Sequence, residues 1–411
     1  MPHHPSLWVR LAGDLAAEPE PPPAHADVVV VGGGVAGVAT ALHLARAGVR
    51  PVVLEAGAVA TRASGRNDGQ LLLGLGEHYN RIVGQFGSER ARQLWSFIRT
   101  NNQRLKDELQ RSVPECDLVD AGGLRLAETE HEQRELEQAA ALLRAEGIAH
   151  ELLDARGLAE VLPPAEGFFG ALRLPGEAIV QPVAMVRGLA RAARAAGAAI
   201  FEHSPVDALV HEGDRIEVRL AGGGRIRAPV VVLCTSALAC HLDDSGFLRA
   251  QVFPFRGQVL ATEPLPGEVA DPFGAWAMSS NFCYEYFRVH RRRFVVGGMR
   301  WSVKGQEEGT LDDATVNPQV TENLLGYVAR HFPSLRGVPF PYAWTGIMAG
   351  TADGLPLLGA LPGRPGLFVH LAFNGYGLSF AFEGGALLAE QVLTGRSTHA
   401  AAELFAPRRF V

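Results

Sequence analysis

The sequence predicts an α/β protein in which a Rossmann-like domain is interleaved with an α+β domain built on an antiparallel sheet. The first observation is the run Val28–Val31, which is typical of a buried parallel strand and leads into a glycine-rich turn. The second is that helix and strand patterns alternate at both ends of the chain. The third is a strand-rich middle, with patterns over Phe253–Thr262, Phe282–Val289 and Arg293–Met299.

The turn after the first strand has the spacing GxGxxG, formed by Gly32, Gly34 and Gly37. These glycines allow a tight turn, close backbone approach to a pyrophosphate and close packing of helix on strand. A second strand, Pro51–Leu54, follows the helix and leads into Glu55, whose carboxylate can accept hydrogen bonds from an adenosine ribose. The pattern therefore predicts a dinucleotide site with the phosphates at a helix N-terminus.

Other elements follow from periodicity and from glycine or proline stops. Helices are expected over Ser88–Arg111, Glu128–Glu146, Pro182–Ala196, Asp312–Phe332 and Leu378–Leu393. Further strands are expected over Ala199–Phe201, Val206–Val210, Asp214–Leu220, Arg225–Ala228, Val230–Leu233 and Leu367–Leu371. Alternation places Tyr284, Tyr286 and Arg288 on one face of a strand.

Composition and charge narrow the class of protein and the kinds of ligand that it can bind. The chain has 411 residues, 47% of them hydrophobic, and a net charge of −6, so it carries no basic footprint for nucleic acid. Its four cysteines lack metal-ligand spacing, which predicts reduced thiols, no metal site and a cytoplasmic protein. No signal peptide or transmembrane run is evident. The stretch Glu18–Pro23 resembles a stiff linker, so residues 1–24 are expected to form a flexible arm.

A second glycine-containing turn, Phe373–Gly377, precedes the last predicted helix. Like the first turn, it combines glycines, which allow close approach of a ligand, with a helix start that offers free N–H groups. A positive helix end aimed at a flavin would stabilise the negative charge of its reduced form. Two such turns, at opposite ends of the chain, favour a flavin over a nicotinamide cofactor.

The ordered set of motifs resembles the FAD-dependent amine and amino-acid oxidases related to D-amino-acid, glycine and sarcosine oxidases, and most of all their γ-glutamylputrescine oxidase branch. The similarity runs from about Asp27 to Phe405. Its carriers are the Val28–Gly48 unit, Ala63–Gln70, Pro175–Pro182, Val231–Ala237, Arg256–Leu265, Tyr284–Arg288, Val295–Gly298, Ala349–Gly359 and Phe373–Ser379.

The resemblance implies FAD and small-molecule amine partners, and it assigns roles to residues of both turns. Together with the motif reading, it gives as cofactor-binding residues Gly32, Gly34, Val35, Ala36, Gly37, Glu55, Ala56, Arg62, Ala63, Ser64, Asn67, Asp68, Gly69, Val206, Thr235, Gly346, Gly350, Asp353, Gly375, Tyr376, Gly377, Leu378 and Ser379. The candidates for substrate orientation and catalysis are Arg66, Tyr284, Tyr286, Arg288, Trp344 and Tyr376.

Departures from the family pattern sharpen these expectations. No cysteine stands in Trp344–Gly350, where the sarcosine oxidase branch attaches its flavin, so FAD is expected to bind noncovalently. Ser379 stands where that branch has a lysine for the substrate carboxylate, so an amine extended beyond a short α-amino acid is expected, with Arg288 or Arg66 holding a distant anion. Tyr376 replaces a histidine that is common in the γ-glutamylputrescine branch.

The expected reaction is oxidation of the C–N bond of an amine or amino acid. Hydride passes to flavin N5, the imine hydrolyses, and dioxygen reoxidises the flavin to give hydrogen peroxide. The alternatives are a dehydrogenase of the same fold that passes electrons to a quinone or other carrier, and a non-catalytic flavoprotein subunit. The FAD-binding domain is expected over 25–85, 170–250 and 335–411, and the substrate-binding domain over 86–169 and 251–334.

Overall fold

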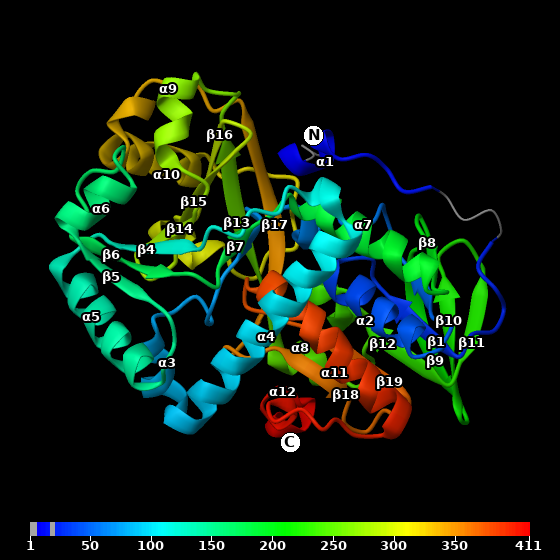
Figure 1. The fold of residues 1–411 in the computed structure, drawn as a ribbon. Helices are drawn as coiled ribbons and strands as arrows, with labels where there is room; N and C mark the ends of the chain where they lie inside the picture. Colours follow the sequence, from blue (N-terminus) through cyan, green and yellow to red (C-terminus); the bar gives the residue numbers. More distant parts are fainter. Residues whose placement is uncertain (1–5, 17–20) are drawn as a thin grey trace.

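The computed structural model describes residues 6–16 and 21–411 (Figure 1). One half contains a six-stranded sheet in the order β18-β19-β12-β1-β2-β8, in which only β18 is antiparallel to its neighbour. Its strands are β1 (Val28–Val31), β2 (Val52–Leu54), β8 (Ala199–Phe201), β12 (Val230–Leu233), β18 (Leu357–Ala360) and β19 (Leu367–Leu371). The predicted Rossmann-like sheet is confirmed.

Both faces of this sheet are covered, which explains the unbroken valine run of β1. Val28 and Val30 pack in one core with helices, whereas Val29 and Val31 pack in another against a three-stranded sheet. The helices are α2 (Val35–Arg46), α7 (Pro182–Ala195) and α11 (Ala381–Thr394), and the three strands are β9 (Val206–Glu212), β10 (Arg215–Leu220) and β11 (Arg225–Ala228) (Figure 1). Alternate strand residues point to opposite faces, so each layer receives half of the valines.

The other half is built on an eight-stranded, largely antiparallel sheet in the order β17-β13-β16-β15-β14-β4-β6-β5. Its strands are β4 (Gly123–Ala127), β5 (Glu151–Asp154), β6 (Gly170–Leu174), β13 (Val252–Ala261), β14 (Ala277–Ser280), β15 (Glu285–His290), β16 (Arg293–Gly297) and β17 (Tyr342–Thr351). Helix α10 (Pro318–His331) packs on one face through Leu324 and Val328, against Phe287 and Phe294. Strands β6 and β17 fall in segments that were assigned to the FAD-binding domain, so the sheet crosses the predicted domain boundaries.

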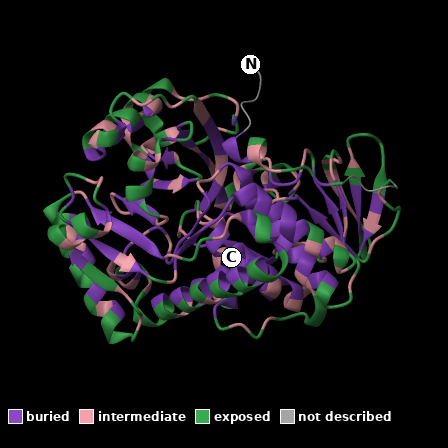
Figure 2. Ribbon diagram, turned by 45° about the horizontal axis from the view of Figure 1, so that its top comes forward, coloured by how far each residue is buried: buried purple, intermediate pink, exposed green. Residues whose placement is uncertain are grey.

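The remaining elements frame these two halves. They are α3 (Tyr79–Phe86), α4 (Ser88–Ser112), α5 (Glu130–Ala145), α6 (Ala155–Val161), α8 (Phe247–Gln251), α9 (Gly267–Ala270), α12 (Ala402–Phe405) and the short pair β3 (Gln70–Leu71) and β7 (Ala178–Ile179). Helix α4 packs against α7 and α11, and Figure 2 shows that the interior between the halves is buried. Within the described part of the chain, no helix has both the length and the apolar character that a membrane span requires.

The N-terminal segment departs from the expected flexible arm. Residues 6–16 carry helix α1 (Leu7–Leu11), and the Trp8 side chain is fully buried. Ser6 Oγ donates to Gly65 O at 2.6 Å, and Arg187 Nη1 donates to Gly13 O at 2.5 Å. The buried indole and these hydrogen bonds fasten the segment to the folded core. Residues 1–5 and 17–20, which include part of the predicted linker, lie outside the described residues.

Three boundary predictions also need correction. The helix expected over Asp312–Phe332 begins at Pro318, because the Asn317 side chain caps it and Pro318 occupies its first turn. The last helix begins at Ala381, after a 3-10 turn over Gly377–Ser379. The strand expected over Phe282–Val289 begins at Glu285 as β15, because Phe282 and Cys283 have positive φ.

Candidate active site

The glycine turn lies between β1 and α2, and it has no room for side chains. Gly32 has φ +110°, and a Cβ on Gly37 would lie 1.9 Å from Gly32 O. A Cβ on Gly34 would lie 2.9 Å from Ser64 Oγ, which accepts a hydrogen bond from Val35 N. The turn therefore offers bare backbone and the start of a 12-residue helix to a bound anion.

Glu55 stands beside this turn, at the end of β2. Its Oε2 accepts from Gly33 N at 2.6 Å and its Oε1 from Gly57 N at 2.8 Å. An ionised carboxylate has about four acceptor positions, so these two bonds orient the group and leave capacity for hydroxyl donors.

The segment from Arg62 to Gly69 folds over the start of α2. Asn67 holds its shape by donating to Ala63 O and Ser64 O and by accepting from Gly69 N. Arg66 is 7% exposed, and its Nη1 donates to Asp313 O and Thr345 O. Burial lowers the pKa of Arg66, although Asp313 opposes that shift.

A cavity of about 390 Å³ runs from the glycine turn to the antiparallel sheet, a size common for small-molecule sites. It is lined by many of the predicted residues, which come from distant parts of the chain. They are Gly34, Val35, Ala36, Ala63, Ser64, Arg66, Asn67, Asp68, Tyr284, Tyr286, Gly346, Gly375, Tyr376, Gly377, Leu378 and Ser379.

Other predicted residues lie outside the lining. They are Gly32, Gly37, Glu55, Ala56, Arg62, Gly69, Val206, Thr235, Arg288, Trp344, Gly350 and Asp353. The turn glycines and Glu55 adjoin the lining residue Gly34, Glu55 through its bond to Gly33 N, and they stay predicted cofactor-binding residues. The expectation for Asp353 has to be corrected, because both of its oxygens pair with Arg409 and fasten the C-terminal segment.

Arg288 also needs correction as a substrate anchor. Arg288 shares a strand face with Tyr286, as expected. It lies two residues further along β15, however, where the Arg62–Gly69 segment covers it. Its Nη1 donates to the carbonyls of Asp68, Gly69 and Val180, and its side chain is 1% exposed. Burial lowers the pKa of Arg288 to about 10. Its observed role is therefore to hold this segment.

Trp344 likewise holds the Arg62–Gly69 segment through a hydrogen bond to its backbone. Its Nε1 donates to Arg66 O at 2.9 Å, and its ring packs edge-on against Trp8 at 6.3 Å between centroids. Trp8 in turn donates from Nε1 to Asn67 O at 2.6 Å. Two buried indoles outside the cavity lining thus support the Arg62–Gly69 segment.

The C-terminal turn closes another wall. Gly375 has φ +95°, and Asn374 Oδ1 accepts from Thr351 N, which ties the turn to β17. Ser379 Oγ donates to Leu72 O at 2.7 Å and accepts from Leu72 N at 3.1 Å. The Ser379 hydroxyl is thus bonded to backbone on both sides.

Tyr284 and Tyr286 reach the cavity from the start of β15. The Tyr286 ring lies over Gly297, where a Cβ would come within 2.2 Å of it. Burial raises the pKa of Tyr286, with Asp68 adding to the shift, so the phenol stays neutral. Burial also raises the pKa of Asp68 to about 6, although Arg288 opposes that shift.

Some lining residues escaped the sequence prediction. They include Gln70, Leu72, Phe253, Phe255, Arg300, Glu308 and Met348. The alternation of Phe253 and Phe255 on β13 and the place of Gln70 directly after the Arg62–Gly69 segment were available signals. Arg300 and Glu308 stand in an irregular loop, where no periodicity could have marked them.

The site fits a flavin dinucleotide. The glycine turn leaves space where side chains would intrude, and buried polar atoms remain for a ligand to satisfy. Among the described lining residues, Asp68 Oδ2 and Gln70 Oε1 are buried without a hydrogen-bond partner. Unsatisfied buried groups are costly, so they point to a ligand that pairs with them.

Comparison with known proteins agrees with this geometry. The chain matches the family described as FAD dependent oxidoreductase (DAO) over residues 27–391. It is 30% identical over 369 residues to the gamma-glutamylputrescine oxidoreductase of Escherichia coli, covering 89% of this chain and 83% of that protein. It is 29% identical to the glycine oxidase of Geobacillus kaustophilus, covering 89% and 92%. The crystal structure of a Geobacillus kaustophilus glycine oxidase superposes with a TM-score of 0.79 at 26% identity, covering 95% of this chain and 100% of that one.

The fold and the site thus define a flavin-dependent oxidoreductase. The protein belongs to the DAO family of FAD-dependent oxidoreductases. The family resemblance and the FAD dependence expected from the sequence are confirmed.

Proposed function

We propose that this protein oxidises the C–N bond of an amine or amino acid, and that its best substrate is an amine extended beyond a short α-amino acid. One observation carries the proposal: a single cavity joins the glycine turn to the tyrosines of the antiparallel sheet. A substrate on that sheet would lie against the reactive end of a dinucleotide held at the turn. The names of the relatives, which mention gamma-glutamylputrescine and glycine, support an amine substrate.

Bound FAD supplies the acceptor for the hydride that leaves the α-carbon. The chain's own side chains hold the amine and exclude water. Phe255, Met348 and Phe373 give the cavity apolar walls, which favour the neutral amine because a charged ammonium is poorly solvated there. The neutral nitrogen uses its lone pair to form the C=N bond as the hydride departs, and water later hydrolyses the imine. The neutral phenol of Tyr286 can donate a hydrogen bond that orients the substrate.

The preference for an extended amine rests on how the cationic and hydroxyl groups near the cavity are already bonded. Ser379 is bonded to backbone, Arg66 is bonded to carbonyls, and Arg288 lies outside the lining. A carboxylate next to the reacting carbon would therefore have to compete with backbone carbonyls and with Asp313 for Arg66. Anaerobic mixing with amines, polyamines and D- and L-amino acids tests this through loss of flavin colour. Glycine, sarcosine or a short D-amino acid as the best substrate would overturn the preference.

We also propose that the FAD is noncovalent. Cys234 and Cys283 line the cavity, but burial raises the pKa of both thiols, that of Cys283 to about 11. The thiolate is the nucleophilic form, so neither is activated for attachment. Acid precipitation should leave yellow flavin in the supernatant, whereas flavin that stays on the pellet would contradict the proposal.

Dioxygen is the proposed acceptor, with hydrogen peroxide as product, and the cytoplasm is the proposed location. A dehydrogenase that uses a quinone or carrier remains the alternative. Stopped-flow mixing of the reduced protein with oxygenated buffer separates the two. Rapid reoxidation is expected, and reoxidation far slower than turnover with an artificial acceptor would favour the dehydrogenase.

A further inference from the structure

Arg300 and Glu308 form an ion pair in the loop after β16, with Nη1 and Oε1 3.6 Å apart. Both line the cavity, and their side chains are 22% and 52% exposed. Tyr284 and Phe253 line the same cavity and are 41% and 39% exposed. These partly exposed residues mark the end where the cavity meets solvent.

This pair differs from the other charged groups of the lining. Each of the others is matched by an opposite charge from outside the lining: Arg66 by Asp313, Asp68 by Arg288 and Glu77 by Arg81. Among the described residues, Arg300 and Glu308 are the pair in which both charges face the cavity. Together they present a positive and a negative group to whatever enters.

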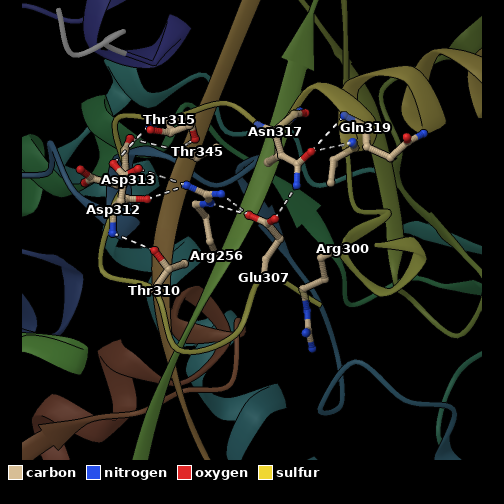
Figure 3. A network of polar contacts seen from close by, with 12 residues as sticks. Arg256, Arg300, Glu307, Thr310, Asp312, Asp313, Thr315, Asn317, Gln319 and Thr345 are labelled. Atoms are coloured by element: carbon tan, nitrogen blue, oxygen red, sulfur yellow. Dashed lines mark hydrogen bonds and ion pairs between the residues drawn. The ribbon is translucent and has the colours of Figure 1, made fainter. Parts of the chain in front are cut away.

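The surrounding loop is held by its other residues. Glu307 accepts from Arg256 Nε at 2.5 Å and from Asn317 Nδ2 at 2.6 Å. Figure 3 shows this network, with the Arg300 guanidinium pointing away from it. Trp301 Nε1 also donates to Glu285 at 2.6 Å. These contacts hold the loop in addition to the bond that Arg300 Nη1 donates to Gln306 O, so the loop does not depend on Arg300 alone.

Arg300 is itself oriented for a ligand. Its guanidinium carbon lies 4.7 Å from the centroid of the Phe255 ring, and Nη1 donates to Gln306 O at 3.1 Å. Stacking of a guanidinium on an aromatic face restricts its rotation. A planar guanidinium binds a carboxylate through two parallel hydrogen bonds, and a carboxylate beside it binds an ammonium.

We propose that Arg300 and Glu308 bind a zwitterionic α-amino-acid group at the far end of the substrate, with its carboxylate on Arg300 and its ammonium on Glu308. This inference rests on the proposed amine oxidation and names the substrate class. A ligand with a carboxylate alone would pair with Arg300 only, and one with an ammonium alone would pair with Glu308 only. A group with both charges satisfies both residues.

Three acylated diamines test this on the FAD-loaded enzyme. γ-Glutamylputrescine carries both charges, glutarylputrescine lacks the α-amino group, and butyrylputrescine lacks both groups. All three keep the same reacting amine, so differences in kcat/KM report the distal end. Each charged contact should be worth about ten- to a hundredfold.

The variants Arg300→Gln and Glu308→Gln assign those differences to residues. Arg300→Gln should abolish the preference for the glutaryl over the butyryl compound, and Glu308→Gln should abolish that for the glutamyl over the glutaryl compound. Lys304→Gln, an exposed residue of the same loop outside the lining, is the matched control and should keep both preferences. Retention of a preference in the corresponding variant would overturn the role given to that residue.

Binding gives a second readout that is independent of turnover. γ-Glutamylbutylamide has the distal group but no reacting amine, and its Kd can be measured by calorimetry. The Kd should rise about ten- to a hundredfold in Arg300→Gln and less in Arg300→Lys, which keeps the charge but loses the planar fork. Flavin reduction by all three acylated diamines with equal efficiency would refute the inference and leave amine oxidation standing. No reduction by any amine would refute both.

Discussion

Replacement of Trp8 by alanine should destabilise the protein and loosen its cofactor. The indole is fully buried, and it packs edge-on against His290 at 5.0 Å and Trp344 at 6.3 Å between centroids. Its Nε1 donates to Asn67 O, inside the Arg62–Gly69 segment that lines the cavity. The substitution therefore removes core volume and a hydrogen bond from one side of the proposed FAD site.

The magnitude follows from these two losses. Truncation of a buried tryptophan to alanine costs about 3–5 kcal/mol, and an unpaired buried carbonyl costs about 1–3 kcal/mol. The two overlap, because the first range already includes partners left unpaired, so about 4 kcal/mol is expected. Trp8→Phe keeps most of the ring and loses the N–H donor, which should cost about 1–2 kcal/mol. These are large fractions of a typical folding free energy of about 5–15 kcal/mol.

Urea unfolding gives the free energies, and the flavin-to-protein ratio after gel filtration gives the retention of FAD. Leu393→Ala is the control: that leucine is 48% exposed, so its truncation should change stability by no more than about 0.5 kcal/mol. A Trp8→Ala variant with a free energy of unfolding within about 1 kcal/mol of wild type and full flavin would show that the N-terminal segment does not support the site.

Three further substitutions have defined outcomes. Gly34→Val places a side chain where Cβ alone would meet Ser64 Oγ at 2.9 Å, so FAD should be lost while the circular dichroism spectrum is retained. A purified variant that is still yellow would show that FAD does not bind at this glycine turn. Arg288→Met removes the side-chain donor of Asp68 O and Val180 O, whereas Gly69 O keeps its bond from Val180 N, so the substitution should cost at least about 2 kcal/mol and lower FAD occupancy; a raised KM at unchanged stability would instead restore Arg288 as a substrate anchor. Asp68 has a pKa of about 6, raised above its ordinary 3.8, so the native state binds more protons between these values and wild-type stability falls as pH rises through that window. In urea unfolding of the apoproteins, the free energy of unfolding of Asp68→Asn relative to wild type should rise by up to about 3 kcal/mol from pH 4 to pH 7. A difference that does not depend on pH would show that the pKa of Asp68 is not raised in the native state.

Local signals predicted the parallel sheet well. Val230–Leu233 and Leu367–Leu371 are strands with the expected bounds, because β-branched and apolar runs that are buried on both faces have few alternatives. The glycine spacing predicted the turn before α2 for a steric reason that is visible in sequence, since a Cβ on Gly37 would overlap Gly32 O. The false start of the helix at Asp312 could have been avoided, because Asn317-Pro318 is a readable helix start.

Long-range pairing was less accessible. Strand β17 contains Gly346 and Gly350, which favour a loop in isolation, and it is a strand because β13 pairs with it in register over ten residues. The buried helix α1 depended on a pocket formed by Trp344, His290 and Asn67, three residues far from Trp8 in the chain. Such elements are stabilised by partners that periodicity does not reveal.

The sequence by itself determined the flavin-dependent family, the two glycine turns and the strand that carries Tyr286 and Arg288, because backbone geometry and side-chain alternation are properties of short segments. Only the tertiary structure decided which further arginine, besides the predicted Arg66, lines the cavity. Arg288 shares the strand face of Tyr286 but lies two residues, about 7 Å, further along and is covered by the Arg62–Gly69 segment. Arg300, in a loop without periodicity, lines the cavity instead, because contacts of its neighbours with β13 and α10 hold that loop at the opening.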